Sequence, residues 1–182
     1  EIIKIDTLGN VSKIIGGYGW NESLFDYPID ISTNILNVYV TDYNNNRIQI
    51  FDKDLNYISE IRNSEKLDFK YPTSSQISNQ GDIFVLDSDN KRILKLNRNG
   101  NLITTIGGFD AGSYQLNSPS KFCIDNNSNL YVISKNYLFI FDQFGNGLKK
   151  IKLNLTLIYY FFSLRNNRKC HGPDVRIAHL NI

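Results

Sequence analysis

Aspartate and arginine recur as a pair along the chain. Asp42 stands five residues before Arg47, and Asp87 stands five residues before Arg92. The two pairs are 45 residues apart. A carboxylate beside a guanidinium can polarise a bound substrate, which would indicate catalysis. A catalytic group is needed once, however, whereas a group that holds a repeated unit together is needed in every unit. We therefore predict a structural role for the residues of this motif, which are Asp42, Asn45, Arg47, Asp87, Asn90 and Arg92.

Two other motifs are similar to ion-binding loops. Asp87-Ser88-Asp89-Asn90 resembles the start of a calcium loop, but Arg92 stands where that loop needs glycine, and no glutamate closes it. Gly16-Gly17-Tyr18-Gly19 would cradle a phosphate if a helix followed, which the sequence does not favour. Because Gly107-Gly108 repeats the position, we interpret these glycines as turns between repeated units. We expect structural loops in both places.

Metal and cofactor chemistry find little support elsewhere. Cys170, His171 and His179 stand at a spacing unlike that of known metal sites, and we interpret them as a chance cluster. Only two cysteines occur, which excludes a small disulfide-stapled scaffold. We expect no catalytic residue, no cofactor and no metal.

The elements that must position these residues repeat with a period of about 45 residues. Phe51, Leu96 and Phe141 are each 45 residues apart. Each unit holds four short apolar or alternating runs that Gly, Asn, Asp and Pro separate, which is typical of a four-stranded antiparallel meander. In the first full unit we predict the strands at 29–32, 38–41, 47–51 and 57–61.

A four-stranded sheet with two apolar faces needs neighbours on both sides, and radial packing of such sheets as blades provides them. We therefore predict an all-β protein, a β-propeller that is incomplete or unusually small. The predicted segments are 1–20 (the end of a split blade), three blades at 21–62, 63–108 and 109–153, and an atypical tail at 154–182. In that tail, 155–162 is strand-prone and is a candidate closing strand.

The first full unit resembles an NHL repeat. The resemblance rests on Tyr27-Pro28 and on the segment from Asp42 through Arg47-Ile48-Gln49-Ile50-Phe51, and it extends over roughly residues 1–153. It implies blades like those of six-bladed NHL propellers, whose function is mostly binding. The third unit departs from the motif, because Ser134-Lys135-Asn136-Tyr137 replaces its Asp and Arg. Six units of this period need about 270 residues, so these three and a half units do not make a six-bladed ring alone.

In a propeller, the connections between blades and the turns between second and third strands open on one face. Aromatic side chains mixed with asparagine suit recognition of a protein or peptide there. The candidate partner-binding residues are Trp20, Tyr43, Asn44, Asn45, Asp89, Lys91, Phe109 and Tyr114, accompanied by Tyr18. The alternative is that some aromatics, Phe25 and Tyr27 in particular, only fill space between blades.

The function predicted from these features is a noncatalytic scaffold that binds a protein or peptide. Two alternatives stay open, a metal-dependent enzyme similar to propeller lactonases or lyases and an RNA-binding NHL domain. Related lyases hold zinc with blade histidines, and the repeats here contain none. Twenty Lys and Arg against eighteen Asp and Glu give a net charge of +2, which is unlike a dedicated nucleic-acid binder.

No run of eighteen apolar residues occurs, so we expect no membrane span. Open blade edges would allow self-association. By analogy with exported bacterial relatives, we expect a location outside the cytoplasm.

Overall fold

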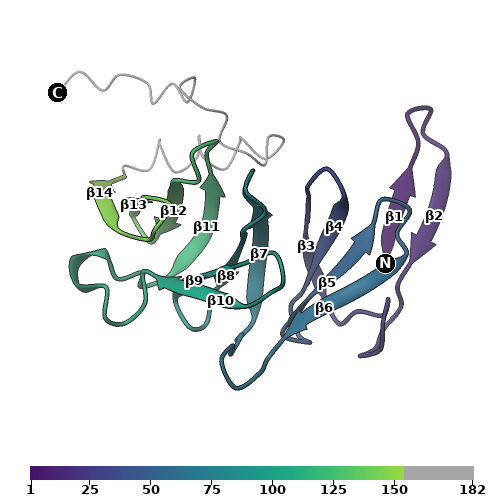
Figure 1. Ribbon diagram of the computed structural model, residues 1–182, viewed down its shortest axis with the longest axis horizontal. Helices are drawn as coiled ribbons and strands as arrows, with labels where there is room; N and C mark the ends of the chain where they lie inside the picture. The colour runs from purple at the N-terminus through teal and green to yellow at the C-terminus, as the bar shows by residue number, and fades with distance from the viewer. Residues whose placement is uncertain (154–182) are drawn as a thin grey trace.

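The computed structural model describes residues 1–153, which form fourteen β-strands in four antiparallel sheets and one short 3-10 turn (Figure 1). A hairpin opens the chain, formed by β1 (Ile2–Ile5) and β2 (Val11–Ile15). The first four-stranded sheet consists of β3 (Pro28–Thr33), β4 (Asn37–Asp42), β5 (Arg47–Asp52) and β6 (Tyr57–Arg62). The second consists of β7 (Pro72–Ile77), β8 (Ile83–Asp87), β9 (Arg92–Leu96) and β10 (Leu102–Ile106). The turn η1 (Gly112–Tyr114) precedes the third sheet, which consists of β11 (Pro119–Ile124), β12 (Leu130–Ser134), β13 (Tyr137–Phe141) and β14 (Gly147–Lys152).

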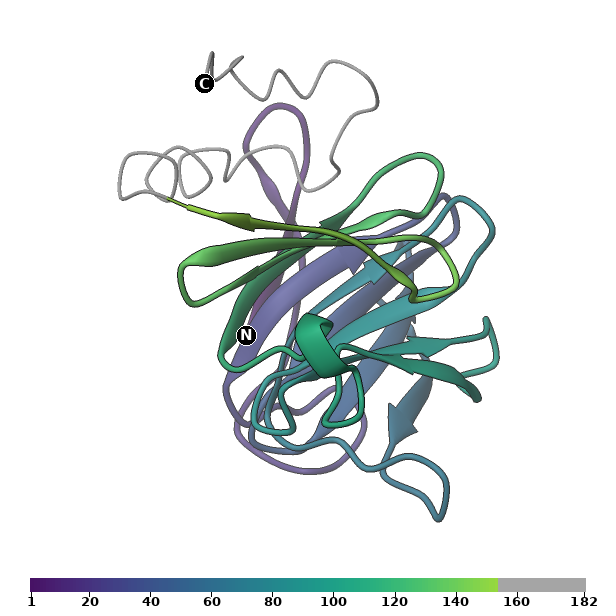
Figure 2. The same cartoon turned by 90° about the vertical axis from the view of Figure 1, so that its left-hand side faces the viewer.

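The sheets follow one another in chain order, with the β1–β2 hairpin at one end of the row and β11–β14 at the other (Figure 1). Figure 2 looks along this row, with the green β11–β14 sheet nearest the viewer. In each full sheet the strands pair in sequence order, and the first strand of the second blade, β7, lies against the first strands of both neighbours, β3 and β11. The all-β prediction of four-stranded antiparallel blades packed side by side is confirmed.

Alternation along the strands explains why the blades pack on both faces. Every residue of β8 is buried. Ile83 and Val85 enter the core shared with the first blade, whereas Phe84 and Leu86 enter the core shared with the third. Because successive strand residues point to opposite faces, an uninterrupted apolar run fits a sheet that is covered on both sides. Burial of each such side chain contributes roughly 1.5–3 kcal/mol to stability.

Polar groups on the first strands of the blades join neighbouring blades, and we call β3, β7 and β11 the axis-side strands. The Asp30 carboxylate on β3 accepts a hydrogen bond from the Ser74 hydroxyl on β7 at 2.8 Å. On β7, the Gln76 amide donates to the Phe122 carbonyl of β11 at 3.0 Å. A register shift follows the proline at the start of each of these strands. A proline there lacks a ladder donor, which suits the irregular first pair.

The predicted strands of the first full blade are confirmed, and each is one or two residues longer in the structure than in the prediction. No helix among residues 1–153 is long and apolar enough to cross a membrane. Three predictions lie outside the described residues: the tail at 154–182, its closing strand at 155–162, and the chance cluster of Cys170, His171 and His179.

Candidate partner-binding face

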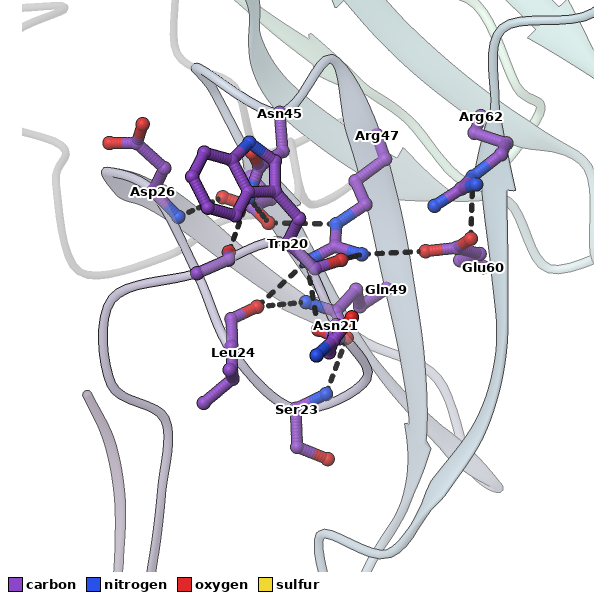
Figure 3. Close-up of polar contacts among 12 residues, drawn as sticks. Trp20, Asn21, Ser23, Leu24, Asp26, Asn45, Arg47, Gln49, Glu60 and Arg62 are labelled. Atoms are coloured by element: carbon purple, nitrogen blue, oxygen red, sulfur yellow. Dashed lines mark hydrogen bonds and ion pairs between the residues drawn. The ribbon is translucent and has the colours of Figure 1, made fainter.

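A buried arginine organises the loop that leads into the first blade. The Arg47 side chain on β5 is only 2% exposed, and its Nε lies 2.9 Å from Oδ2 of the fully buried Asp42. Its Nη1 donates to the Trp20 carbonyl at 2.6 Å and to the Glu60 carboxylate at 2.8 Å. Its Nη2 donates to the carbonyls of Asn21 and Leu24. One side chain on β5 thus joins the loop before β3 to the end of β4 and to the edge strand β6 (Figure 3).

Two amide side chains, those of Asn45 and Gln49, add to these bonds, and we refer to Asp42, Asn45, Arg47 and Gln49 together as the clamp. The Gln49 amide donates to the Leu24 carbonyl at 2.7 Å and accepts from the Ser23 N–H at 2.9 Å. The Asn45 amide donates to Asp42 at 2.8 Å and to the Gly19 carbonyl at 2.9 Å. The loop at 16–27 is therefore fixed to the β4–β5 turn and to β5 through side-chain hydrogen bonds (Figure 3).

The second blade repeats a simpler form of the clamp. Arg92 Nε lies 2.8 Å from Oδ2 of the buried Asp87, and the Asn90 amide donates to the same oxygen at 2.9 Å. Arg92 and Asn90 both donate to the Asp68 carbonyl. The Arg92 side chain is 25% exposed, compared with 2% for Arg47.

The third blade uses a hydroxyl in place of the carboxylate. The Ser134 Oγ accepts from the Asn117 and Ser118 N–H groups at 3.1 and 3.0 Å. In the second blade the Asp87 carboxylate accepts the corresponding bond from the Lys70 N–H at 2.7 Å. Ser134 therefore retains the contact with the interblade loop, while Tyr137 at the arginine position packs beside Phe139.

The clamped loop presents two exposed aromatic rings. Tyr18 is 73% exposed and Trp20 is 68% exposed, and their ring centroids lie 5.7 Å apart in an edge-on arrangement. The two rings flank Gly19, which has a φ of 156° and whose added Cβ would meet the Leu24 side chain at 2.7 Å. Glycine is therefore favoured between them, because a side chain here would strain the backbone and displace the end of the Leu24 side chain.

A second aromatic group spans two blades. Tyr43 in the β4–β5 turn lies edge-on to Tyr27 at 5.7 Å and stacks on Tyr71 at 5.0 Å between ring centroids. Tyr27 and Tyr71 each precede the first strand of their blade, and Tyr43 is the half-buried middle ring. We refer to Tyr27, Tyr43 and Tyr71 as the tyrosine ladder. Sequence reasoning missed Tyr71, although Tyr71-Pro72 repeats Tyr27-Pro28 at a spacing of 44 residues and could have indicated it.

Several predicted face residues lie in the turns beside these rings. Exposed Asn44 donates to the Asp26 carboxylate at 2.8 Å, and exposed Asp89 lies 3.5 Å from the Lys70 ammonium. Exposed Lys91 closes the β8–β9 turn with a φ of 54°. Phe109, in the loop after β10, is 91% exposed.

Other aromatic residues divide between the face and the core. Tyr114 packs edge-on to Phe141 at 5.9 Å in the core between the second and third blades. Phe25 is 3% exposed and fills space between the hairpin and the first blade, as the alternative interpretation expects. Tyr27 is 64% exposed, so the space-filling interpretation is wrong for that residue.

The β1–β2 and β5–β6 turns each contain an aspartate that accepts hydrogen bonds within the turn. Asp52, at the end of β5, accepts hydrogen bonds from the Asn56 N–H and the Asn56 amide, both at 2.8 Å. These bonds to the ionised form lower the pKa of Asp52 below its ordinary value. The equivalent bonds from Asn10, side chain first, lower the pKa of Asp6. Within residues 1–153, no three His, Cys, Asp or Glu side chains are grouped so as to hold a metal ion.

The fold and the repeated turn motif define the class of protein, a β-propeller built from four-stranded antiparallel blades. Within this class the chain carries an NHL repeat, because residues 25–51 match the family model for that repeat. The NHL resemblance of the sequence is thereby confirmed.

Comparison with known proteins places the similarity along most of the chain. Protein brain tumor of Drosophila melanogaster is 32% identical over 142 residues, which cover 74% of this chain and 13% of that protein. The chain therefore spans a small part of this relative's length.

Solved structures share the fold. Virginiamycin B lyase from Staphylococcus aureus, in its selenomethionine-substituted form, superposes with a TM-score of 0.61 at 18% identity, covering 81% of this chain and 47% of that chain. A protein of unknown function from Bacteroides caccae superposes with a TM-score of 0.57 at 16% identity, covering 82% of this chain and 58% of that chain. At these identities the likeness concerns the fold alone.

Proposed function

We propose that this NHL-repeat propeller is a noncatalytic scaffold that binds a protein or peptide through its loop face, the surface formed by the interblade loops and the β4–β5 and β8–β9 turns. The observation that carries the proposal is Trp20, a large ring that is 68% exposed on a loop held by buried side chains. Trp and Tyr are enriched among the residues that dominate binding energy at protein interfaces. A loop whose backbone is fixed before binding loses little conformational freedom when a partner arrives.

The bonds that the repeated charged residues make within the blade support a noncatalytic role. Arg47 directs its Nε and both Nη groups at Asp42, Glu60 and loop carbonyls. The Asp42 carboxylate accepts from Arg47, from the Asn45 amide and from the Asp26 N–H. Groups that are occupied in this way hold the structure together and have little capacity left to polarise a substrate.

The test is to select binding peptides for the whole chain from a displayed library of protein fragments and to measure their affinities for variants. We expect Trp20→Ala to weaken the selected binders by about tenfold or more. Phe144→Ala is the matched control, because Phe144 is also 68% exposed but lies in the β13–β14 turn. If the selected peptides bind Trp20→Ala with the same affinity as the parent chain, the proposal is refuted.

A further inference from the structure

The tyrosine ladder is a continuous aromatic surface that crosses from the first blade to the second. Tyr27 is 64% exposed and Tyr71 is 38% exposed, with Tyr43 in contact with both. The rings at the two ends belong to different interblade loops, so the ladder exists only where two blades meet. Any ligand that covers all three rings would contact both blades.

Backbone geometry fixes the two outer rings. Tyr27 and Tyr71 have φ angles of 62° and 52°, a left-handed conformation that is unusual for a bulky side chain. Neighbouring hydrogen bonds hold it in place, since the Tyr71 N–H donates to the Asn46 side chain at 2.8 Å and the Tyr27 carbonyl accepts from the Tyr43 N–H at 3.3 Å. Glycine would adopt this conformation without strain, whereas a tyrosine adopts it at a conformational cost.

The polar groups around the ladder restrict what it can bind. The Asn44 side-chain amide donates to the Asp26 carboxylate, and the side-chain oxygen of Asn46 accepts from the Tyr71 N–H. Both asparagine side chains therefore already have partners within the loop face. Opposite charges stand at the two ends of the ladder, since Asp26 precedes Tyr27 and Lys70 precedes Tyr71, so the ladder has no net charge that would favour an anionic or a cationic ligand. Because Tyr43 stacks on Tyr71 and meets Tyr27 edge-on, the rings partly cover one another. What the surface offers a ligand is the exposed parts of the outer rings Tyr27 and Tyr71 and the edge of Tyr43, which favours an uncharged ligand with apolar rings of its own.

A proline-rich peptide meets this description. In the polyproline II conformation its rings project from a helix with three residues per turn and a rise of 3.1 Å, so that one turn covers about 9 Å. The ladder spacings of 5.7 and 5.0 Å between consecutive centroids cover a length of the same order. The backbone carbonyls of such a helix have no internal partners, and tyrosine hydroxyls can donate to them. Aromatic surfaces are a recurring receptor for these peptides.

We propose that Tyr27, Tyr43 and Tyr71 form a docking surface for a proline-rich segment in the polyproline II conformation. The inference rests on the proposed function, which it narrows to one class of peptide and one part of the loop face. Trp20 lies on the adjoining loop, which Asn45 joins to the β4–β5 turn, and it is separate from the ladder.

The experiment titrates the whole chain with a decaproline peptide, with a Gly-Ser peptide of the same length as a control, and follows the aromatic NMR signals of the ladder. The variants are Tyr27→Gly and Tyr71→Gly, because glycine accepts the left-handed backbone and removes only the ring. We expect decaproline binding by the parent chain, a loss of about tenfold or more in each glycine variant, and an unchanged affinity in Phe144→Ala.

Each alternative outcome has a defined meaning. No binding of decaproline, or equal binding by the glycine variants, overturns the inference. If selected peptides still bind in a manner that depends on Trp20, the proposed function stands without it. Binding of oligouridine or maltohexaose to the ladder in place of decaproline also overturns the inference, because the rings would then serve a different ligand class.

Discussion

Removal of the Arg47 side chain tests whether the clamp determines the stability of the first blade. In Arg47→Ala, the fully buried Asp42 loses its ionic partner and Glu60 loses one of its cationic neighbours. The Trp20 carbonyl loses its donor, whereas the carbonyls of Asn21 and Leu24 each lose one of two donors. The main cost is the buried Asp42 carboxylate, which keeps hydrogen bonds from Asn45 and the Asp26 N–H but has no cation to offset its charge.

The magnitude follows from burial. Breaking a buried ion pair by removing one partner costs about 3–5 kcal/mol. For a chain of this size that corresponds to a melting temperature lowered by roughly 6–20 °C. Arg92→Ala is the matched comparison, because Arg92 occupies the same position in the second blade but is 25% exposed and bonds only Asp87 and the Asp68 carbonyl among the described residues. Loss of such charged hydrogen bonds costs about 1.5–3 kcal/mol.

Equilibrium urea denaturation followed by circular dichroism measures both variants. The chain has a single tryptophan, so Trp20 emission reports separately on the clamped loop. We expect the free energy of unfolding to fall more in Arg47→Ala than in Arg92→Ala, with a change in Trp20 emission in the native state of the first variant only. Equal destabilisation by the two substitutions would show that Glu60 and the loop carbonyls add nothing, which would refute the reasoning.

Two further perturbations address the turns. In Gly107→Ala the new Cβ would lie 2.5 Å from the buried Leu116 side chain, and the backbone is left-handed with a φ of 69°. In the same urea assay we expect Gly107→Ala to be destabilised by about 1–3 kcal/mol more than Gly81→Ala. Gly81 is the control because its φ is 88° and the space around it is open. Equal losses of stability would show that the Leu116 side chain can move aside without an energetic cost. Hydrogen bonds from Asn56 lower the pKa of Asp52 in the folded state, so the stability that they contribute is present above the unfolded pKa and is lost as pH falls through the folded value. Between about pH 5 and pH 2 we expect Asp52→Asn to lose less stability than the parent chain, and an identical pH dependence would contradict this assignment.

Much of the fold could be predicted from the sequence because its signals are local or periodic. The run from Ile83 to Asp87, bounded by turn residues, is typical of a strand that is buried on both faces. The spacing of 45 residues between Arg47 and Arg92 indicated one turn geometry in two blades, and both form the same bond to aspartate.

The site was less accessible to sequence reasoning because it depends on contacts between distant segments. Gln49 and Glu60 join the clamp only when the loop before β3 folds back over β5 and β6 pairs beside it. The tyrosine ladder depends on a left-handed backbone at Tyr27 and Tyr71, which the backbone preferences of tyrosine do not predict. Tyr114 could not be separated from exposed neighbours such as Phe109, since both lie between β10 and β11 and only packing against Phe141 distinguishes them.

The hydrogen bonds between the axis-side strands have a mechanical consequence. Asp30 with Ser74, and Gln76 with the Phe122 carbonyl, fasten neighbouring blades at their inner edge, far from the outer strands β6 and β10. We expect relative motion of two blades to be a pivot about this seam, with amplitude growing toward the rim. Tyr27 and Tyr71 directly precede β3 and β7, so a ligand that bridges them would extend this seam beyond the ends of the inner strands and stiffen the pivot itself.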